Sequence, residues 1–139
     1  MNSEILGDLI MTIYKNLKTK MERDLKQYDI GMGQMQILMV FFSDVAGIKT
    51  QIELAKQLSV DKGNISRSMV KLLEKGYIEQ TEDSKKSFRL TEKGIELKLE
   101  IIQIFMRINE LMTEDIGVKD VDQTLMTLTK ISKNLEGII

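Results

Sequence analysis

Between Asp61 and Lys75 the chain concentrates side chains of the kinds that proteins use to bind DNA. Asparagine, serine and arginine side chains can hydrogen-bond to base edges in a major groove, and lysine side chains can pair with phosphates. A glycine near the start of such a segment would let the backbone come close to a phosphate. The candidate DNA-binding residues of this segment are Lys62, Gly63, Asn64, Ser66, Arg67 and Lys71. These side chains would recognise DNA by hydrogen bonds and by electrostatic attraction.

The spacing of apolar residues predicts that a single helix presents these side chains. The apolar residues stand at i, i+4, i+7 and i+8, so they share one face of a helix. They are Ile65, Met69, Leu72 and Leu73. The candidate DNA-binding residues fall on the opposite face or at its flanks. We expect this helix to run from about residue 61 to residue 75 and to end at Gly76, a residue type that favours helix C-termini.

A shorter helix and a turn come before this helix. Thr50 and Glu53 have the spacing of a capping box, in which the threonine hydroxyl accepts a hydrogen bond from the Glu53 amide. Apolar residues then give a short helix, which extends to Leu58, one buried face. Residues 59–61 prefer caps and turns to helix interiors. The two helices and the turn between them predict a helix-turn-helix.

After Gly76 the pattern changes to that of a β-hairpin. Residues 77–81 and 87–90 indicate two strands, and the polar residues 82–86 indicate the link between them. Lys85 and Lys86 lie near the predicted tip, where basic side chains suit a phosphate backbone or a minor groove. Thr91 is a plausible N-cap for a further helix. A helix-turn-helix followed by such a hairpin is typical of a winged helix-turn-helix, which is a DNA-binding module.

The remaining segments predict helices with long apolar stripes over residues 3–28, 34–44, 91–117 and 119–136. Such stripes could simply complete the core of one chain. We favour a helical dimerisation bundle, because a long helix that leaves a compact lobe needs a partner to cover its stripe. The residues predicted to contribute are Leu6, Ile10, Ile13, Ile101, Phe105, Ile108, Leu128 and Ile131.

The amino-acid composition excludes several classes of protein and of functional site. The length of 139 residues suits one domain. The net charge of −1 gives no global signal for nucleic acid, so the prediction of DNA binding rests on the local charge of residues 61–75 and of the hairpin. The chain has no cysteine and no histidine, which excludes disulfides, Cys/His zinc sites, thiol nucleophiles and histidine-based triads. We expect neither an enzyme nor a cofactor or metal. No apolar run approaches the ~20 residues of a membrane helix, and the start lacks a signal-peptide pattern, so we expect a cytoplasmic protein.

The segment from Glu53 to Gly94 resembles the MarR family of transcription regulators. The matching positions are Glu53-Leu54-Ala55, Leu58, Val60-Asp61-Lys62, Ile65-Ser66-Arg67, Leu72, Lys75-Gly76-Tyr77-Ile78 and Leu90-Thr91-Glu92-Lys93-Gly94. The resemblance implies a mainly α fold with a small hairpin wing: one MarR-like domain over 1–139, with a DNA-binding lobe at 33–94 and dimerisation helices at 1–30 and 95–139. Asn64, Ser66, Arg67 and Lys71 would then enter the major groove, while Asp83, Lys85 and Lys86 would reach the minor groove.

The same resemblance implies the partners. It points to a homodimer on a pseudo-palindromic double-stranded operator, acting as a repressor and released by a small organic effector. The chain departs from the family in two places. The wing is several residues short and carries Asp83-Ser84-Lys85 in place of Asp-x-Arg, and Gly33 stands where the family has threonine. A short wing and weak net charge leave a second interpretation open, a winged-helix module for protein–protein interaction without specific DNA binding.

Overall fold

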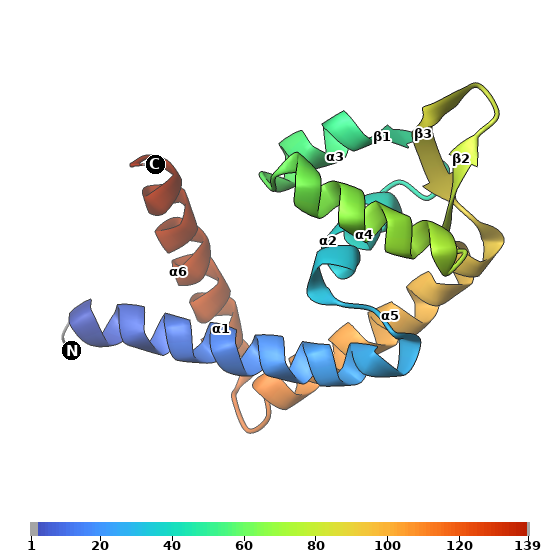
Figure 1. Ribbon diagram of the computed structural model, residues 1–139. Helices are drawn as coiled ribbons and strands as arrows, with labels where there is room; N and C mark the ends of the chain where they lie inside the picture. Colours follow the sequence, from blue (N-terminus) through green and yellow to red (C-terminus); the bar gives the residue numbers. More distant parts are fainter. Residues whose placement is uncertain (1–2, 139) are drawn as a thin grey trace. The chain divides into compact units, whose positions relative to one another are not determined.

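The computed structural model describes residues 3–138, of which Ser3 and Glu4 are described by backbone only. In chain order the elements are α1 (Ser3–Leu25), the short 3-10 helix η1 (Lys26–Tyr28), α2 (Met32–Phe42), β1 (Lys49–Thr50), α3 (Gln51–Leu58), α4 (Lys62–Glu74), β2 (Ile78–Thr81), β3 (Ser84–Leu90), α5 (Glu92–Met112) and α6 (Val118–Glu136) (Figure 1). The chain divides into two compact units, residues 1–104 and 105–139. The predicted mainly α fold with a winged helix-turn-helix is confirmed.

The core of the winged lobe forms around α2, which is apolar nearly all round and therefore buried. Helices α3 and α4 both pack against α2, and α4 contributes the predicted stripe of Ile65, Met69 and Leu72, each at most 2% exposed. Leu73, which the spacing placed on the same stripe, is only half-buried. Burial of these side chains fixes which face of α4 points outward.

Both ends of α4 are set by local chemistry. Asp61 is the N-cap, and its carboxylate accepts from the backbone amide of Asn64 at 2.9 Å. At the other end, the amides of Gly76 and Tyr77 donate to the carbonyls of Leu73 and Leu72, and Gly76 has a φ of +77°. This is a Schellman motif, for which the left-handed backbone favours glycine. The predicted helix limits are confirmed, with Gly76 as the residue after the C-cap.

The wing is a three-stranded antiparallel sheet in the order β1-β3-β2 (Figure 1). The sequence predicted only a two-stranded hairpin and missed β1, which has two residues and pairs Lys49 with Phe88. The predicted link of residues 82–86 is also wrong, because the turn contains only Glu82 and Asp83. Lys85 and Lys86 therefore lie within β3 and not at the tip.

Several predicted boundaries move. The helix expected over 3–28 ends at Leu25 and continues as η1, and Asp29 closes it with a left-handed φ of 54°. Helix α2 begins at Met32 with Gly31 as N-cap, so Gly33 lies inside the helix. A Cβ on Gly33 would stand 3.0 Å from the Ser68 hydroxyl, and glycine there lets α2 approach α4 closely. Helix α5 ends at Met112, before the predicted end at residue 117.

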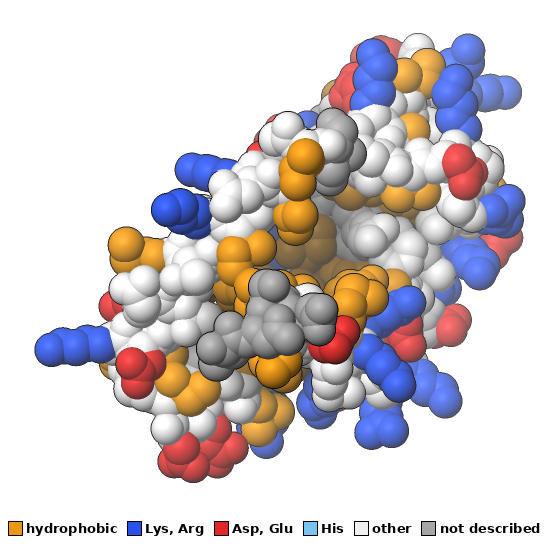
Figure 2. Space-filling view, turned by 90° about the vertical axis from the view of Figure 1, so that its left-hand side faces the viewer, with side chains coloured by type: hydrophobic (Ala, Val, Ile, Leu, Met, Phe, Trp, Pro, Cys, Tyr) orange, Lys and Arg blue, Asp and Glu red, His pale blue; other side chains and the backbone are white. Residues whose placement is uncertain are grey.

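The terminal helices expose much of their apolar surface. Helix α6 is amphipathic, yet none of its described side chains is buried. Of the predicted dimerisation residues, Leu6, Ile13 and Leu128 are exposed, while Ile10, Phe105 and Ile131 are partly exposed. Ile101 and Ile108 are at most 5% exposed within the single chain. Only the exposed and partly exposed residues of this set are therefore available to contact a second chain. On the face in Figure 2, hydrophobic side chains reach the surface at many points.

Candidate nucleic-acid interface

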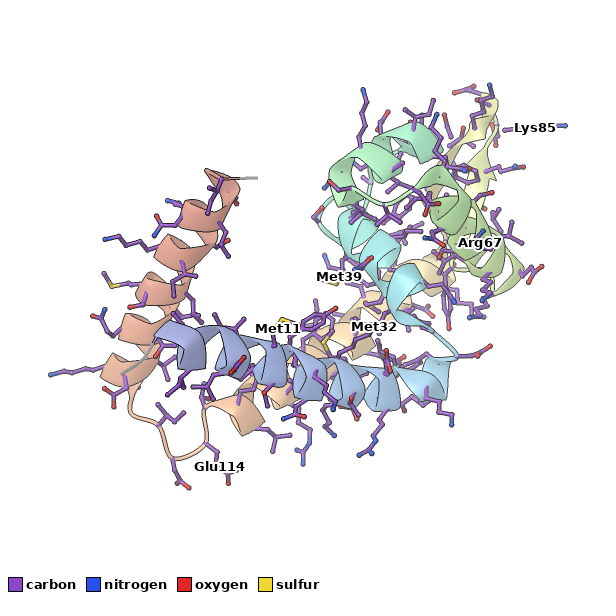
Figure 3. The ribbon with its side chains drawn as sticks, turned by 60° about the vertical axis from the view of Figure 1, so that its left-hand side comes forward. Met11, Met32, Met39, Arg67, Lys85 and Glu114 are labelled. Atoms are coloured by element: carbon purple, nitrogen blue, oxygen red, sulfur yellow. The ribbon has the colours of Figure 1, made fainter. Side chains whose placement is uncertain are left out.

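The outer face of α4 carries all the candidate residues that the sequence placed on this helix. The exposed residues are Lys62, Gly63, Asn64, Ser66, Arg67 and Lys71. Because the opposite face is anchored in the core, this face can enter a groove without loss of packing. Figure 3 shows Arg67 on the outer side of α4 and Lys85 extending outward from the wing of the same lobe.

Val70 is a residue of this face to which the sequence reasoning assigned no contact. Its side chain is 49% exposed although it is apolar, and it follows Arg67 by three residues on the same face of α4. Apolar side chains in a major groove can contact the methyl group of thymine. The signal was present in the sequence, as an apolar residue outside the stripe of Ile65 and Met69.

A hydrogen-bonded series of side chains runs along the first two turns of α4. Asp61 Oδ2 accepts from Asn64 Nδ2 at 2.8 Å, while Asp61 Oδ1 caps the helix. Asn64 Oδ1 in turn accepts from Arg67 Nη2. The three residues stand at i, i+3 and i+6, so each lies one turn from the next. Two of the residues predicted to enter the major groove, Asn64 and Arg67, are thus linked to each other.

The start of α4 and the wing share one hollow. Lys62 from α4 and Lys85 and Lys86 from β3 line a cavity of about 330 Å³, whose other walls are Thr50, Gln51 and Ile52. No acidic side chain is among these lining residues. The three lysines that line this hollow all carry ammonium groups, which suit a phosphate. The structure therefore brings together the basic residues that the sequence had assigned to two separate elements.

The tip of the wing has the opposite charge. Its turn residues, Glu82 and Asp83, are exposed carboxylates, and Asp83 is the residue to which the family resemblance gave a minor-groove role. Farther back, Arg89 Nε donates to Glu79 Oε1 at 3.0 Å across the β2–β3 pair. The basic surface of the wing consequently lies along β3, through Lys85 and Lys86, and the acidic turn projects beyond it.

Lys75 differs from the other basic residues of the segment. Its ammonium group donates to Gln34 Oε1 at 2.6 Å and to the carbonyl of Asp29, and its side chain is only 21% exposed. It therefore joins the turn after α1 to the end of α4. These contacts give Lys75 a structural role at the end of α4.

Behind this end of α4, Tyr77 is buried, and the Lys93 ammonium lies 4.8 Å from the centre of its ring. Burial and the nearby Glu100 carboxylate raise the pKa of Tyr77 above its usual value of 10.0, and the same two causes raise the pKa of Tyr28. Both phenols are therefore neutral at ordinary pH and support the fold without charge. Within residues 3–138, no helix is long and apolar enough to cross a membrane, and no three metal-ligating side chains come together.

A core-anchored helix with hydrogen-bonding and basic side chains on its outer face, followed by a wing that carries lysines, defines a winged-helix DNA-binding domain. A family model described as a winged helix DNA-binding domain matches residues 34–94. The chain is also 32% identical over 99 residues to an uncharacterised HTH-type transcriptional regulator of Bacillus cereus. That match covers 68% of this chain and 66% of the relative.

Solved structures agree with this class. A MarR transcriptional regulator from Methanosarcina mazei Go1 superposes with a TM-score of 0.86 at 24% identity, covering 100% of this chain and 94% of that one. A mutant MarR from E. coli in complex with operator DNA gives a TM-score of 0.73 at 24% identity, covering 91% and 92% of the two chains. The chain therefore has the fold of MarR transcription regulators and carries a winged helix DNA-binding domain similar to that of HTH-type transcriptional regulators.

Proposed function

We propose that the protein is a dimeric, sequence-specific DNA-binding repressor that recognises a pseudo-palindromic operator. The observation that carries this proposal is the outer face of α4, where Asn64, Ser66 and Arg67 are exposed, while Ile65, Met69 and Leu72 of the same helix are buried. The E. coli relative solved with operator DNA has the same fold, which supports DNA as the partner. In this proposal α4 enters the major groove, and Lys62, Lys85 and Lys86 hold the flanking phosphates.

Arg67 offers the direct test, because its side chain lies outside the core. Arg67→Ala should leave the fold intact and weaken binding to a selected operator by about 1–3 kcal/mol. Arg23→Ala is a suitable control, since Arg23 is exposed in the last turn of α1, outside the proposed interface. Unchanged operator affinity in a folded Arg67→Ala protein would remove α4 from the interface.

The proposed dimer rests on the terminal helices. Leu125, Leu128 and Leu135 of α6 are between 46% and 58% exposed, although they lie on the apolar side of an amphipathic helix. A second copy of the chain would cover such surface, and a two-fold protein suits a two-fold operator. We expect deletion of residues 118–139 to give monomers or aggregates in sedimentation velocity. A full-length chain that stays monomeric and well folded at micromolar concentration would contradict the dimer.

Release by a small organic ligand is the regulatory part of the proposal. A hollow of about 550 Å³ lies between the turn after α1 and the end of α4. Its lining is mixed in charge, with three lysines (Lys26, Lys71 and Lys75) and three carboxylates (Glu22, Asp29 and Glu74). A phenolic or carboxylate compound bound there would shift DNA affinity only if it bound two arrangements of the lobe unequally. The test is a screen of such compounds for release of a selected operator. Occupancy that follows protein concentration alone would indicate a constitutive regulator.

The competing function is a protein–protein interaction module, which the acidic turn at Glu82 and Asp83 favours. A salt titration separates the two. Repression through DNA predicts that the affinity for duplex falls steeply as salt rises, with a slope set by the number of phosphates contacted. A duplex affinity that is weak and equal for all sequences would favour the interaction module.

A further inference from the structure

The hydrogen bonds at the start of α4 suggest how the helix selects a base. We propose that Asp61 is a positioning residue for base specificity, which acts by fixing the side-chain amide of Asn64 and, through it, the guanidinium of Arg67. This inference rests on the proposed function and refines it. Asp61 itself touches no base in this arrangement, because both of its carboxylate oxygens are directed at Asn64.

The contacts leave Asn64 with a single amide orientation. Asp61 Oδ1 accepts from the backbone amide of Asn64 at 2.9 Å, and Asp61 Oδ2 accepts from Asn64 Nδ2 at 2.8 Å. A carboxylate accepts hydrogen bonds but donates none, so the amide cannot turn its oxygen toward Asp61. Asn64 Oδ1 therefore faces the other way, where it accepts from Arg67 Nη2. The two charged residues, Asp61 and Arg67, together set the orientation of the Asn64 amide.

This orientation determines what the surface offers to a base. Bidentate recognition of adenine by asparagine needs a free amide oxygen and a free N–H on the same edge. Here the oxygen of Asn64 is engaged by Arg67, and one of its two N–H groups by Asp61. Arg67 has five N–H donors and uses one, so the surface presents mainly donors. Donors match the O6 and N7 acceptors of guanine.

Gly63 provides the space for this arrangement. A Cβ on Gly63 would stand 3.2 Å from Asp61 Oδ1 and 3.4 Å from Arg67 Nη1. The guanidinium of Arg67 therefore lies back over the first turn of α4, beside the glycine. The geometry points to guanine at the base pair that faces Arg67, and against adenine selection by Asn64.

The test uses the full-length protein and compares a selected operator with duplexes that each carry one substituted base pair. For the wild type, we expect at least about tenfold discrimination in favour of guanine at one position of each half-site. Asp61→Ser keeps an N-cap oxygen but cannot also hold Asn64 Nδ2. This variant should lose most of the discrimination at that position, while its affinity for random duplex stays equal or rises through the lost negative charge.

Glu53→Gln is the matched control, because it also removes one negative charge from the helix-turn-helix but lies outside the Asp61–Asn64–Arg67 contacts. It should keep the wild-type discrimination. If Asp61→Ser fails to fold, the isosteric Asp61→Asn replaces it and should also lose discrimination, because the amide nitrogen that replaces Oδ2 is a donor and cannot accept from Asn64 Nδ2. A folded Asp61 variant with wild-type discrimination at every position overturns the inference alone. A wild-type protein that discriminates no base pair overturns the proposed function as well.

Discussion

Lys75→Met should destabilise the protein by about 2 kcal/mol, because it removes the polar contacts that join the end of α4 to the turn after α1. The Lys75 ammonium donates to Gln34 Oε1 at 2.6 Å, and Gln34 is only 7% exposed. A hydrogen bond from a charged group contributes about 1.5–3 kcal/mol, and leaving a buried acceptor unpaired costs about 1–3 kcal/mol. The ion pair with Asp29 adds little, since the Asp29 side chain is 95% exposed. Methionine keeps most of the apolar part of the lysine side chain, so the decrease in the free energy of unfolding measures the loss of the polar contacts.

The measurement is urea unfolding followed by circular dichroism at one fixed protein concentration, because association would couple stability to concentration. Lys71→Met is the matched control on the same helix, since Lys71 is exposed. The control should change the free energy of unfolding by less than about 0.5 kcal/mol, yet lower DNA affinity and reduce the salt slope by about 1. Equal unfolding midpoints for Lys75→Met and the wild type would refute the structural role given to Lys75.

Three further substitutions follow from the same structure, and the third is tested by the pH dependence of stability. Gly94→Ala should destabilise the protein by about 3 kcal/mol, because a Cβ there would overlap the carbonyl oxygen of Tyr77. Gly7→Ala should instead stabilise α1 by about 0.5–1 kcal/mol, because a Cβ on Gly7 would have no other atom within 4 Å. Urea titration measures both, and equal effects would contradict the close contact at Gly94. The raised pKa values of Tyr28 and Tyr77 mean that their contribution to stability is fully present below pH 10.0 and is lost as pH rises through the higher folded pKa. Tyr77→Phe should therefore weaken the fall in stability between about pH 9 and pH 11, and an unchanged fall would show that burial of Tyr77 does not cause it.

Much of the winged lobe was predictable because its signals are local. The capping box at Thr50 is confirmed by the bond from the Glu53 amide to the threonine hydroxyl at 3.1 Å. The apolar spacing of Ile65, Met69 and Leu72 placed the outer face of α4 correctly, because helical periodicity alone decides which side chains are buried together. The same local rules identified Gly76 as the end of the helix.

The features that were missed depend on pairing and on tertiary contact. Strand β1 has two residues and exists only because β3 lies beside it, so no periodicity could indicate it. The length of the wing turn depends on the register of β2 and β3, which the polar run of residues 82–86 does not reveal. Lys75 looks like any exposed lysine of a basic helix until α2 brings Gln34 to it. The contacts of Asp61 with Asn64 are local, but the sequence reasoning treated Asp61 only as a cap or turn residue and did not link it to Asn64.

The central claim is that α4 reads DNA sequence in a two-fold protein, and selection of bound duplexes from a random pool tests it most directly. We expect enrichment of an inverted repeat whose half-site centres lie one helical turn apart, about 10–10.5 base pairs, because two copies of α4 must enter successive major grooves. Each half-site should contain the guanine assigned to Arg67. A pool that shows no enrichment after repeated rounds, or that yields a single unrepeated site, would contradict the account.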